Sequence, residues 1–311
     1  MQHFQSLDDI HLHGAWLTIG SFDGVHKGHQ AIIKKLTAGA HASGVPAVVL
    51  TFHPHPAVIL RNRQGPYYLT SPEERAARLG ELGIDAVITH PFTPEFASQS
   101  AFEFMRRIKS QLNLQHLLVG YDFALGRNRE GDPQALRRIG QELGYSLDIM
   151  EPVYNGGQLI SSSQIRAALA EGQIEEVNHL LDWTYQVSGE VVHGDGRGRT
   201  IGIPTANLKT WPGKLLPCTG VYACLAYLEG RAWQAVSNIG VRPTFENQPL
   251  EARLETHLLD FKGDLYHKQI TLAFVKRLRD EQRFPDVTTL INQIQQDILQ
   301  ARSALDHFPG T

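Results

Sequence analysis

The hydrophobic pattern of this chain changes its period near Trp183. Before that residue, apolar runs of strand length alternate with segments of helical spacing; after it, runs with a period of two follow one another closely. Alternation with helical crossovers predicts a parallel, doubly wound sheet, and closely spaced strands with one terminal helix predict a small β-barrel. We therefore expect an α/β chain of two domains, residues 1–183 and 184–311. The length of 311 residues agrees, since single cores rarely exceed about 250–300 residues.

The expected elements can be stated as ranges. In the first domain the strands are 15–22, 46–52, 85–90, 116–120 and 146–150, and the helices are 27–42, 72–82, 98–111, 133–143 and 164–170. In the second domain the strands are 185–192, 221–228, 232–236, 254–259 and 270–276. The terminal helix, 287–305, is expected to be amphipathic, with an apolar face of Leu290, Ile291, Ile294, Ile298 and Leu299.

Composition limits the classes of partner. The net charge is -3, so the chain lacks a general basic field for nucleic acid or an anionic membrane. Only Cys218 and Cys224 are present, at a spacing that fits neither a metal knuckle nor a disulfide scaffold. No apolar run reaches about 18 residues, and the N-terminus lacks the core of a signal peptide. We expect a cytoplasmic protein; an oligomer is compatible with the sequence.

The segment Gly20-Ser21-Phe22-Asp23-Gly24-Val25-His26-Lys27-Gly28-His29 joins an expected strand to an expected helix. A helix start offers free backbone N–H groups and the positive end of the helix dipole, which suit a phosphate. His26 and His29 share a helix face and can point at one anion, while Gly28 keeps bulk away from it. On spacing alone, a solvated histidine pair or a helix cap explains the pattern equally well.

Other polar segments also follow expected strands, where ligands bind in a doubly wound sheet. His53 and His55 alternate with prolines that fix the backbone, as a ligand-stacking segment or simply a rigid loop; a metal would need a third ligand that is not in view. Arg127 and Arg129 lie in a glycine-containing segment that could hold a polyanion or be solvated.

Hydroxyl and carboxylate groups supply the remaining signals. Ser161-Ser162-Ser163 could cap a helix, and Arg166 one turn later could clamp a phosphate. Residues 194–202 contain four glycines, which favours close backbone approach to a ligand, yet the Gly-Lys-Ser/Thr ending of a Walker P-loop is missing. Glu255 on an expected strand could take a proton from a hydroxyl, or be an exposed strand carboxylate.

These motifs, taken in order, resemble those of the bacterial bifunctional riboflavin kinase/FAD synthetases over nearly the whole chain. The Gly20–His29 string and Ser-Ser-Ser-x-Ile-Arg are similar to the adenylyltransferase motifs. Gly-Arg-x-x-Gly-x-Pro-Thr-Ala-Asn and Glu-x-His are similar to the riboflavin kinase signature. The sequence departs from the family pattern at Leu125, where Phe is usual, at Ser163 for Thr, and at His267 for Gly.

The resemblance implies a fold and two activities. Residues 1–183 would be a nucleotidyltransferase-like FMN adenylyltransferase domain, and residues 184–311 a riboflavin kinase barrel with a terminal helix. The enzyme would phosphorylate riboflavin to FMN with ATP, then adenylylate FMN to FAD with release of pyrophosphate. Mg²⁺ would assist both steps.

The resemblance also implies roles for single residues. Catalytic roles fall to His26, His29, Arg166 and Glu255. ATP contacts fall to Gly20, Phe22, Asp23, Gly28, Asn128, Ser162, Ser163, Gly196, Gly202, Thr205 and Asn207, and the last two would also hold Mg²⁺. Flavin contacts fall to His53, Pro54, Asp122, Phe123, Arg242, Arg279 and Glu281. Residues 237–245 are expected to form a loop near the flavin and the nucleotide.

Two other functions compete with this interpretation. Class I aminoacyl-tRNA synthetases share the His-x-Gly-His turn, but their lysine-rich second signature is not seen and the charge balance is acidic. The alternative is a riboflavin kinase with a non-catalytic, flavin- or nucleotide-binding N-terminal domain. The intact histidines and the Ser-Ser-Ser-x-x-Arg segment argue against that alternative.

Overall fold

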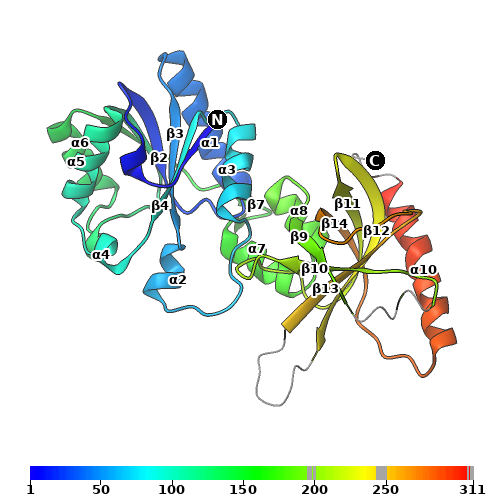
Figure 1. The fold of residues 1–311 in the computed structure, drawn as a ribbon. Helices are drawn as coiled ribbons and strands as arrows, with labels where there is room; N and C mark the ends of the chain where they lie inside the picture. The colour runs from blue at the N-terminus through cyan, green and yellow to red at the C-terminus, as the bar shows by residue number, and fades with distance from the viewer. Residues whose placement is uncertain (195–197, 199–200, 243–250, 307, 309–311) are drawn as a thin grey trace. The chain divides into compact units, whose positions relative to one another are not determined.

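The computed structural model describes residues 1–311 apart from 195–197, 199–200, 243–250, 307 and 309–311 (Figure 1). The chain divides into two compact units, Met1–Ser162 and Ser163–Thr311. Both parts of the predicted architecture are confirmed: a parallel sheet covered by helices in the first unit, and a closed antiparallel barrel in the second. No described helix is long and apolar enough to cross a membrane.

The first unit is built on a six-stranded parallel sheet with the order β1-β4-β3-β2-β5-β6. Its strands are β1 (Gln2–Phe4), β2 (Ala15–Ile19), β3 (Ala47–His53), β4 (Ala86–Pro91), β5 (Leu114–Gly120) and β6 (Ser146–Met150). Strand order reverses beside β2, and in such sheets ligands bind at the carboxyl ends of the strands near the reversal.

Helices connect these strands, four of them at bounds close to the predicted ones and two short ones, 56–60 and 94–97, that were not predicted. They are α1 (Lys27–Ala42), α2 (Pro56–Leu60), α3 (Pro72–Glu81), α4 (Pro94–Ala97), α5 (Ala101–Leu112) and α6 (Pro133–Leu143). The Ser71–Glu74 capping box before α3 is present. The expected helix 98–111 is wrong at its start, because Ser98 ends α4 and Ser100 forms a new capping box with Glu103 for α5.

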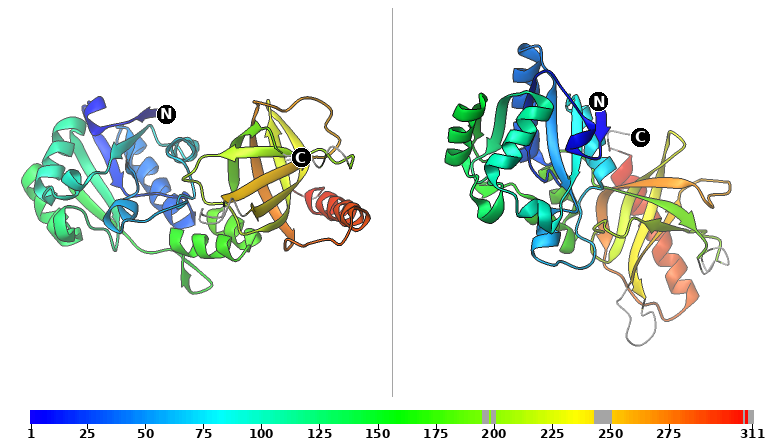
Figure 2. Two further views of the ribbon diagram at one scale, coloured as in Figure 1. Left: turned by 60° about the horizontal axis from the view of Figure 1, so that its bottom comes forward. Right: turned by 60° about the vertical axis from the view of Figure 1, so that its left-hand side comes forward.

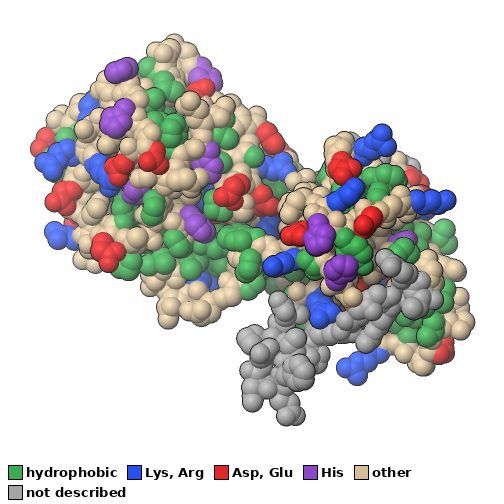
Figure 3. Space-filling model, viewed as in Figure 1, with side chains coloured by type: hydrophobic (Ala, Val, Ile, Leu, Met, Phe, Trp, Pro, Cys, Tyr) green, Lys and Arg blue, Asp and Glu red, His purple; other side chains and the backbone are tan. Residues whose placement is uncertain are grey.

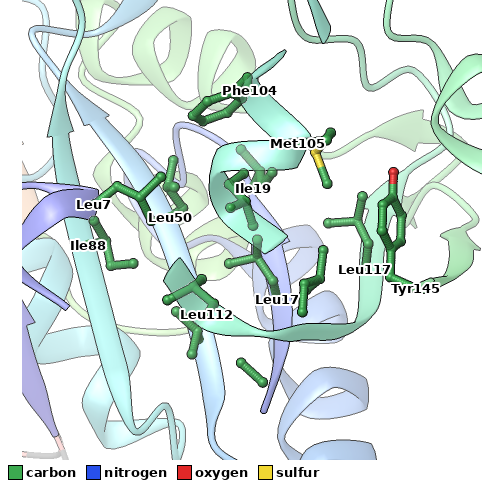
Figure 4. Packing of buried hydrophobic residues seen from close by; sticks show 14 of the residues in the cluster. Leu7, Leu17, Ile19, Leu50, Ile88, Phe104, Met105, Leu112, Leu117 and Tyr145 are labelled. Carbon is green, nitrogen blue, oxygen red and sulfur yellow. The ribbon is translucent and has the colours of Figure 1, made fainter. Parts of the chain in front are cut away.

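The two faces of the sheet are covered by different helices. On one face, Phe104 and Met105 of α5 pack on Leu17, Leu50 and other strand residues (Figure 4). On the other face, α1 and α3 cover strand residues that alternate with those, such as Val49 and Val87. This period of two on buried strands is what a sheet between two helix layers requires.

Two helices precede the barrel, α7 (Ser162–Ala170), which belongs to the second unit from Ser163 on, and α8 (Ile174–Leu181). Asn178 on α8 donates from Nδ2 to the Phe274 carbonyl and accepts at Oδ1 from the Tyr185 backbone, which fixes α8 on the barrel. The sequence analysis missed α8. A domain boundary at 183/184 stays a prediction, and the compact units divide about one helix pair earlier.

The barrel closes in the order β10-β13-β12-β11-β14-β9 (Figure 2). Its strands are β9 (Gln186–Val192), β10 (Ala206–Thr210), β11 (Gly220–Leu228), β12 (Arg231–Arg242), β13 (Glu251–Leu258) and β14 (Gln269–Arg279). β11 is almost wholly buried and pairs with β12 and β14. Strand β10 was not predicted. The expected loop at 237–245 is wrong for its first six residues, which continue β12; residues 243–250 lie outside the description.

Helix α10 (Val287–Leu305) has the predicted bounds, and its predicted apolar face is partly buried at every position except Leu299. Asp297, Ala301 and Leu305 are buried, whereas Leu299 is 68% exposed, so its assignment to the apolar face was wrong. Leu299 lies two residues from both Asp297 and Ala301, and that spacing turns it away from the barrel.

At the departure from the family pattern at residue 267, His267 adopts a left-handed φ of 62°, a conformation that glycine favours. Its Nδ1 lies 3.1 Å from the Glu190 carboxylate. On the face shown in Figure 3, acidic and basic side chains of the described residues are interspersed rather than gathered by sign. That distribution agrees with the small net charge of the chain.

Candidate active sites

The first unit contains a cavity of about 440 Å³ at the carboxyl ends of β2, β3, β5 and β6. Glycine, histidine, hydroxyl and aromatic side chains are mixed around it. The lining includes Gly20, Phe22, His26, Gly28, His29, Phe52, His55, Tyr121, Asp122, Phe123, Arg129, Ser161 and Ser162. The cavity therefore offers both anion-binding groups and flat apolar surfaces for a ring system.

His26 and His29 stand together at the start of α1. Their rings are stacked with centroids 3.6 Å apart, and Phe22 meets His29 edge-on at 5.0 Å. His26 is the N-cap residue, but its side chain makes no cap hydrogen bond. A Cβ at Gly28 would lie 3.2 Å from the His26 ring, so glycine lets the ring pack against the backbone. The two imidazoles and the positive end of α1 thus face one space.

The hydroxyl segment reaches this cavity through its first two residues. Ser162, the last residue of the first unit, donates from its Oγ to the Asp23 carbonyl of the histidine turn at 2.9 Å. Ser163 and Arg166 belong to the second compact unit and are not among the residues lining the cavity. Arg166 follows Ser162 by one turn of the same helix.

Asp23 lies behind the cavity and does not line it. Its side chain is fully buried, and the carboxylate accepts hydrogen bonds from the backbone N–H groups of Leu69 and Thr70, each at 3.0 Å. The sequence pattern could not show whether the Asp23 carboxylate contacts a nucleotide or, as found here, holds the turn from its buried side. Arg75, also fully buried, lies 3.8 Å from it.

Only part of the His-Pro segment lines the cavity. His55 and Pro56 line the cavity, whereas His53 and Pro54 are not among the lining residues. The His53 ring packs 5.4 Å from Tyr68, and burial, followed by the positive charge of Arg75, lowers the pKa of His53. His55 caps α2, with its Nδ1 accepting from the Ala57 N–H. His55 is thus a cavity residue that was quoted in its motif without being assigned a role.

The loop after β5 also contributes unequally. Asp122 and Phe123 line the cavity, as does Arg129, whose Nη2 donates to the Asp122 carbonyl at 2.9 Å. Asn128 is not a lining residue and has a left-handed φ of 52°. Leu125, where the family pattern has Phe, packs against the hydrophobic core and is not among the lining residues.

The second unit contains a separate cavity of about 520 Å³ on the outer side of the barrel, beside α10. Polar and apolar groups are mixed on the strand side, and the helix side is mostly apolar. The lining includes Gly198, Thr205, Asn238, Glu255, His257, Arg279, Glu281, Phe284, Val287, Leu290, Ile294 and Asp297. The sequence analysis had named Thr205, Glu255, Arg279 and Glu281, but not Asn238 or Asp297.

One row of residues runs across the strands beneath this cavity. Glu255 lies directly opposite Asn207 on β10 and Asn238 on β12, and Asn238 lies opposite Val221. Val221 in turn pairs with Arg279 on β14. Residues opposite one another in neighbouring strands share a face, with Cβ atoms about 5 Å apart. The register therefore brings together an amide, a carboxylate, a second amide and a guanidinium from distant parts of the chain.

Several contacts shape this second site. His257 Nδ1 donates to the Pro204 carbonyl at 2.7 Å, which holds the Thr205 segment beside β13. A Cβ at Gly240 would lie 2.6 Å from the Glu281 carboxylate, so glycine makes room for that side chain. A Cβ at Gly194 would overlap the Asn207 amide in the same way.

Three residues to which the resemblance gave a role are not placed at the second cavity. Gly202 has a left-handed φ of 77° and no atom within 4 Å of its hypothetical Cβ. Gly196 lies outside the described residues, as does the side chain of Arg242 at the end of β12.

Among the described residues, no group of three or more His, Cys, Asp or Glu side chains could hold a metal. The donor set that fits a hard cation is of another kind: the Thr205 hydroxyl and the Asn207 amide oxygen near Glu255. Mg²⁺ commonly takes few protein ligands and completes its shell with water and substrate phosphates, so two such donors suit it.

Comparisons with known proteins cover both halves of the chain. A family model described as FAD synthetase matches residues 8–164, and one described as riboflavin kinase matches residues 181–305. The bifunctional riboflavin kinase/FMN adenylyltransferase of Pseudomonas fluorescens is 40% identical over 291 residues, covering 93% of both chains. The enzyme of the same name from Escherichia coli K12 is 38% identical, covering 93% of this chain and 92% of its own.

A solved structure resembles the whole chain. It is described as a macrolide-efflux protein from Streptococcus pneumoniae, with a TM-score of 0.87 and 29% sequence identity, and the match covers 96% of this chain and 98% of that one. That description is said of the other protein; the likeness itself extends through both units.

Proposed function

Because this chain belongs to the family of bifunctional riboflavin kinase/FMN adenylyltransferases, we propose that its barrel cavity phosphorylates riboflavin and its N-terminal cavity converts the resulting FMN to FAD. One observation carries this assignment. Each half of the chain matches its own family model and holds its own cavity, with the histidine pair lining one and Glu255 the other.

In the N-terminal cavity the reaction is adenylyl transfer. An FMN phosphate oxygen forms a bond to the α-phosphorus of ATP, and the bond from that phosphorus to the bridging oxygen breaks, releasing pyrophosphate. His26 and His29, with the N–H groups at the start of α1, stabilise the charge that builds on the phosphate oxygens. Ser162 stays tied to the turn while Phe22, Tyr121 and Phe123 supply apolar faces. Positioning and electrostatics provide the catalysis.

In the barrel cavity the reaction is phosphoryl transfer. Glu255 takes the proton from the ribityl 5′-hydroxyl of riboflavin as the γ-phosphoryl group of ATP is transferred and ADP leaves. The position of Glu255 between Asn207 and Asn238 supports this role, because the neighbouring amides can orient both carboxylate and substrate. The apolar residues of α10 give the flavin ring a surface to pack on.

Thr205 and Asn207 would hold Mg²⁺ together with phosphate oxygens of the nucleotide. Bound there, Mg²⁺ neutralises charge on the transferring phosphate. Arg166 and Ser163 are proposed to act on the nucleotide of the adenylyl-transfer site, which rests on their motif alone.

The test is to incubate the protein with riboflavin, ATP and Mg²⁺ and separate the flavins by chromatography. We expect FMN to appear first and FAD to follow from it. Supplied FMN should give FAD without riboflavin. FMN as the only product, even after long incubation, would instead support a kinase with a non-catalytic N-terminal domain.

A further inference from the structure

We propose that Asp23 and Arg75 form a buried positioning device that holds the His26–His29 turn in its working conformation. Both side chains have 0% exposure, and neither lines the cavity. They therefore act through the turn, and not on a substrate. The inference rests on the proposed adenylyl transfer in the N-terminal cavity and adds positioning residues to it.

The turn itself needs support, because its backbone is unusual. Phe22, Gly24 and Val25 have φ angles of 46°, 84° and 41°. The left-handed region is unfavourable for residues with a Cβ, most of all for a β-branched one such as Val25. Such a conformation persists only where surrounding contacts over-determine it. The turn ends at His26, so any relaxation of these residues would move both histidines.

Asp23 supplies the contacts from inside the turn. Its carboxylate accepts from the N–H groups of Leu69 and Thr70 and from the Thr70 hydroxyl at 3.2 Å. The Thr70 Oγ1 accepts in turn from the Gly24 N–H at 3.1 Å. The carbonyl of Asp23 is held from the other side by the Ser162 hydroxyl. The turn is thus bonded to the loop before α3 and to the start of α7.

Arg75 on α3 supports the other side of the turn. Its Nη1 donates to the Thr51 hydroxyl at 2.9 Å, and the Thr51 hydroxyl donates to the Ser21 carbonyl at 3.0 Å. Its Nη2 donates to the Thr70 carbonyl at 3.4 Å and lies 3.8 Å from the Asp23 carboxylate. One guanidinium therefore links β3, the loop before α3 and the turn.

Stability alone does not call for this arrangement. A buried ion pair is commonly no more stable than apolar side chains of the same volume, whereas a planar guanidinium can bond several groups in fixed directions at once. Three described contacts of Arg75 lead, directly or through one threonine, to residues 21–24, and a fourth reaches the Phe52 carbonyl of β3 at 3.5 Å. Fixed direction at the turn is what this geometry provides.

The test compares Arg75→Met with Arg78→Met, a matched control on the same helix whose guanidinium pairs with Glu81 at the surface. We expect Arg75→Met to lower kcat for FMN adenylylation about 100-fold, since small displacements of catalytic groups cost that much. KM for ATP should change little. Riboflavin phosphorylation by the same chain should stay unchanged and report that the protein is intact. Arg78→Met should behave as the parent does.

A second pair of variants keeps the test decisive if Arg75→Met does not fold. Thr51→Val preserves shape and removes both bonds of the Thr51 hydroxyl, and it should lower kcat in the same way though less. Arg75→Lys keeps the charge and should recover part of the loss. Because the pair acts as a unit, Asp23→Asn combined with Arg75→Met should cost no more than the worse single variant.

Titration with a non-hydrolysable ATP analogue separates positioning from simple loss of structure. A positioning role leaves both proposed ATP sites of the chain able to bind the analogue, whereas unfolding of the first unit leaves only the site in the barrel. Parent-like kcat in both Arg75→Met and Thr51→Val, or a fall matched by lost binding sites, would overturn the inference. If the parent protein itself made no FAD from FMN, the proposed function would fail instead.

Discussion

The Arg279 guanidinium donates two parallel hydrogen bonds to the Asp297 carboxylate, from Nε to Oδ1 at 2.9 Å and from Nη2 to Oδ2 at 2.8 Å. Arg279 is the last residue of β14 and Asp297 lies in the middle of α10, so this ion pair holds the helix beside the barrel cavity. Gln293 Nε2 also donates to the same carboxylate, at 2.9 Å. Both charged side chains line the cavity proposed for riboflavin.

Replacing Asp297 with Ala should destabilise the second unit and weaken riboflavin binding together. Losing one partner of a buried pair costs about 3 kcal/mol, because the other charge stays desolvated. Denaturant unfolding and KM for riboflavin measure the two effects. The control is Asp260→Asn, whose partner Arg302 is exposed, and which should cost less than about 1 kcal/mol. An equal loss of unfolding free energy in the two variants would contradict this role of the Arg279–Asp297 pair.

Replacing Glu255 with Gln should abolish most riboflavin phosphorylation and spare FAD formation from supplied FMN. Loss of a general base lowers kcat by about 100- to 10,000-fold. Asn207→Ala should act in the same direction, because Asn207 lies opposite Glu255 on β10. Glu229→Gln, at an exposed hairpin turn, is the matched carboxylate control. If Glu255→Gln removed both activities in a folded protein, the two-site assignment would be wrong.

Replacing His29 with Ala should give the opposite result: FAD formation lost, FMN formation kept. Removal of one such charge-stabilising group typically lowers kcat about 100- to 1,000-fold. Replacing His29 also removes the ring stacked on His26, so the double variant His26→Ala/His29→Ala should lose less than the product of the two single losses. Chromatography of flavins after incubation with FMN and ATP measures the loss of FAD formation in each variant. A strictly multiplicative loss would show that the two rings act independently.

The N-terminal unit should lose stability as the pH falls below about 6.5. Burial, followed by the positive charge of Arg107, lowers the pKa of His90 below its ordinary value of 6.5, and its neutral Nδ1 accepts from the Leu7 N–H at 3.2 Å. The unfolded chain then binds a proton at a pH where the folded chain does not, so unfolding becomes easier on acidification until the folded pKa is passed. Burial lowers the pKa of His3, His53 and His116 in the same direction.

The measurement is the free energy of unfolding of this unit at pH 7.5 and at several lower values. His90→Asn keeps an acceptor for the Leu7 N–H but cannot take up the proton. Its stability should therefore fall less steeply with pH than that of the parent. Identical slopes in the two proteins would rule out His90 as a contributor.

Much of the fold follows from the sequence where several local signals coincide. Helices α1, α6 and α10 have the predicted bounds, and the Ser71–Glu74 box marks α3. The analysis missed β10, because Asn207 and Lys209 alternate with too few apolar residues to show a period of two. The predicted helix 98–111 began three residues before α5, because Ser98, which ends the unpredicted α4, stands only two residues before the true N-cap, Ser100.

The sites were predicted only as far as motifs reach. The histidine turn and Glu255 carry sequence patterns, and both line cavities. Asn238 and Asp297 join the second cavity through strand register and helix docking, neither of which is encoded in a short string. Arg75 carries no sequence signal at all, since an arginine in a helix gives no sign that it is buried.

The row of polar residues across the barrel has a consequence for folding. Asn207, Glu255, Asn238 and Arg279 come from four strands and meet only through their pairings. Pairings between distant segments form late, after the chain has lost the entropy of closing its loops. Refolding should thus restore kinase turnover in a single phase that coincides with closure of the barrel. The rate at which activity returns then measures the rate of the last step of that closure.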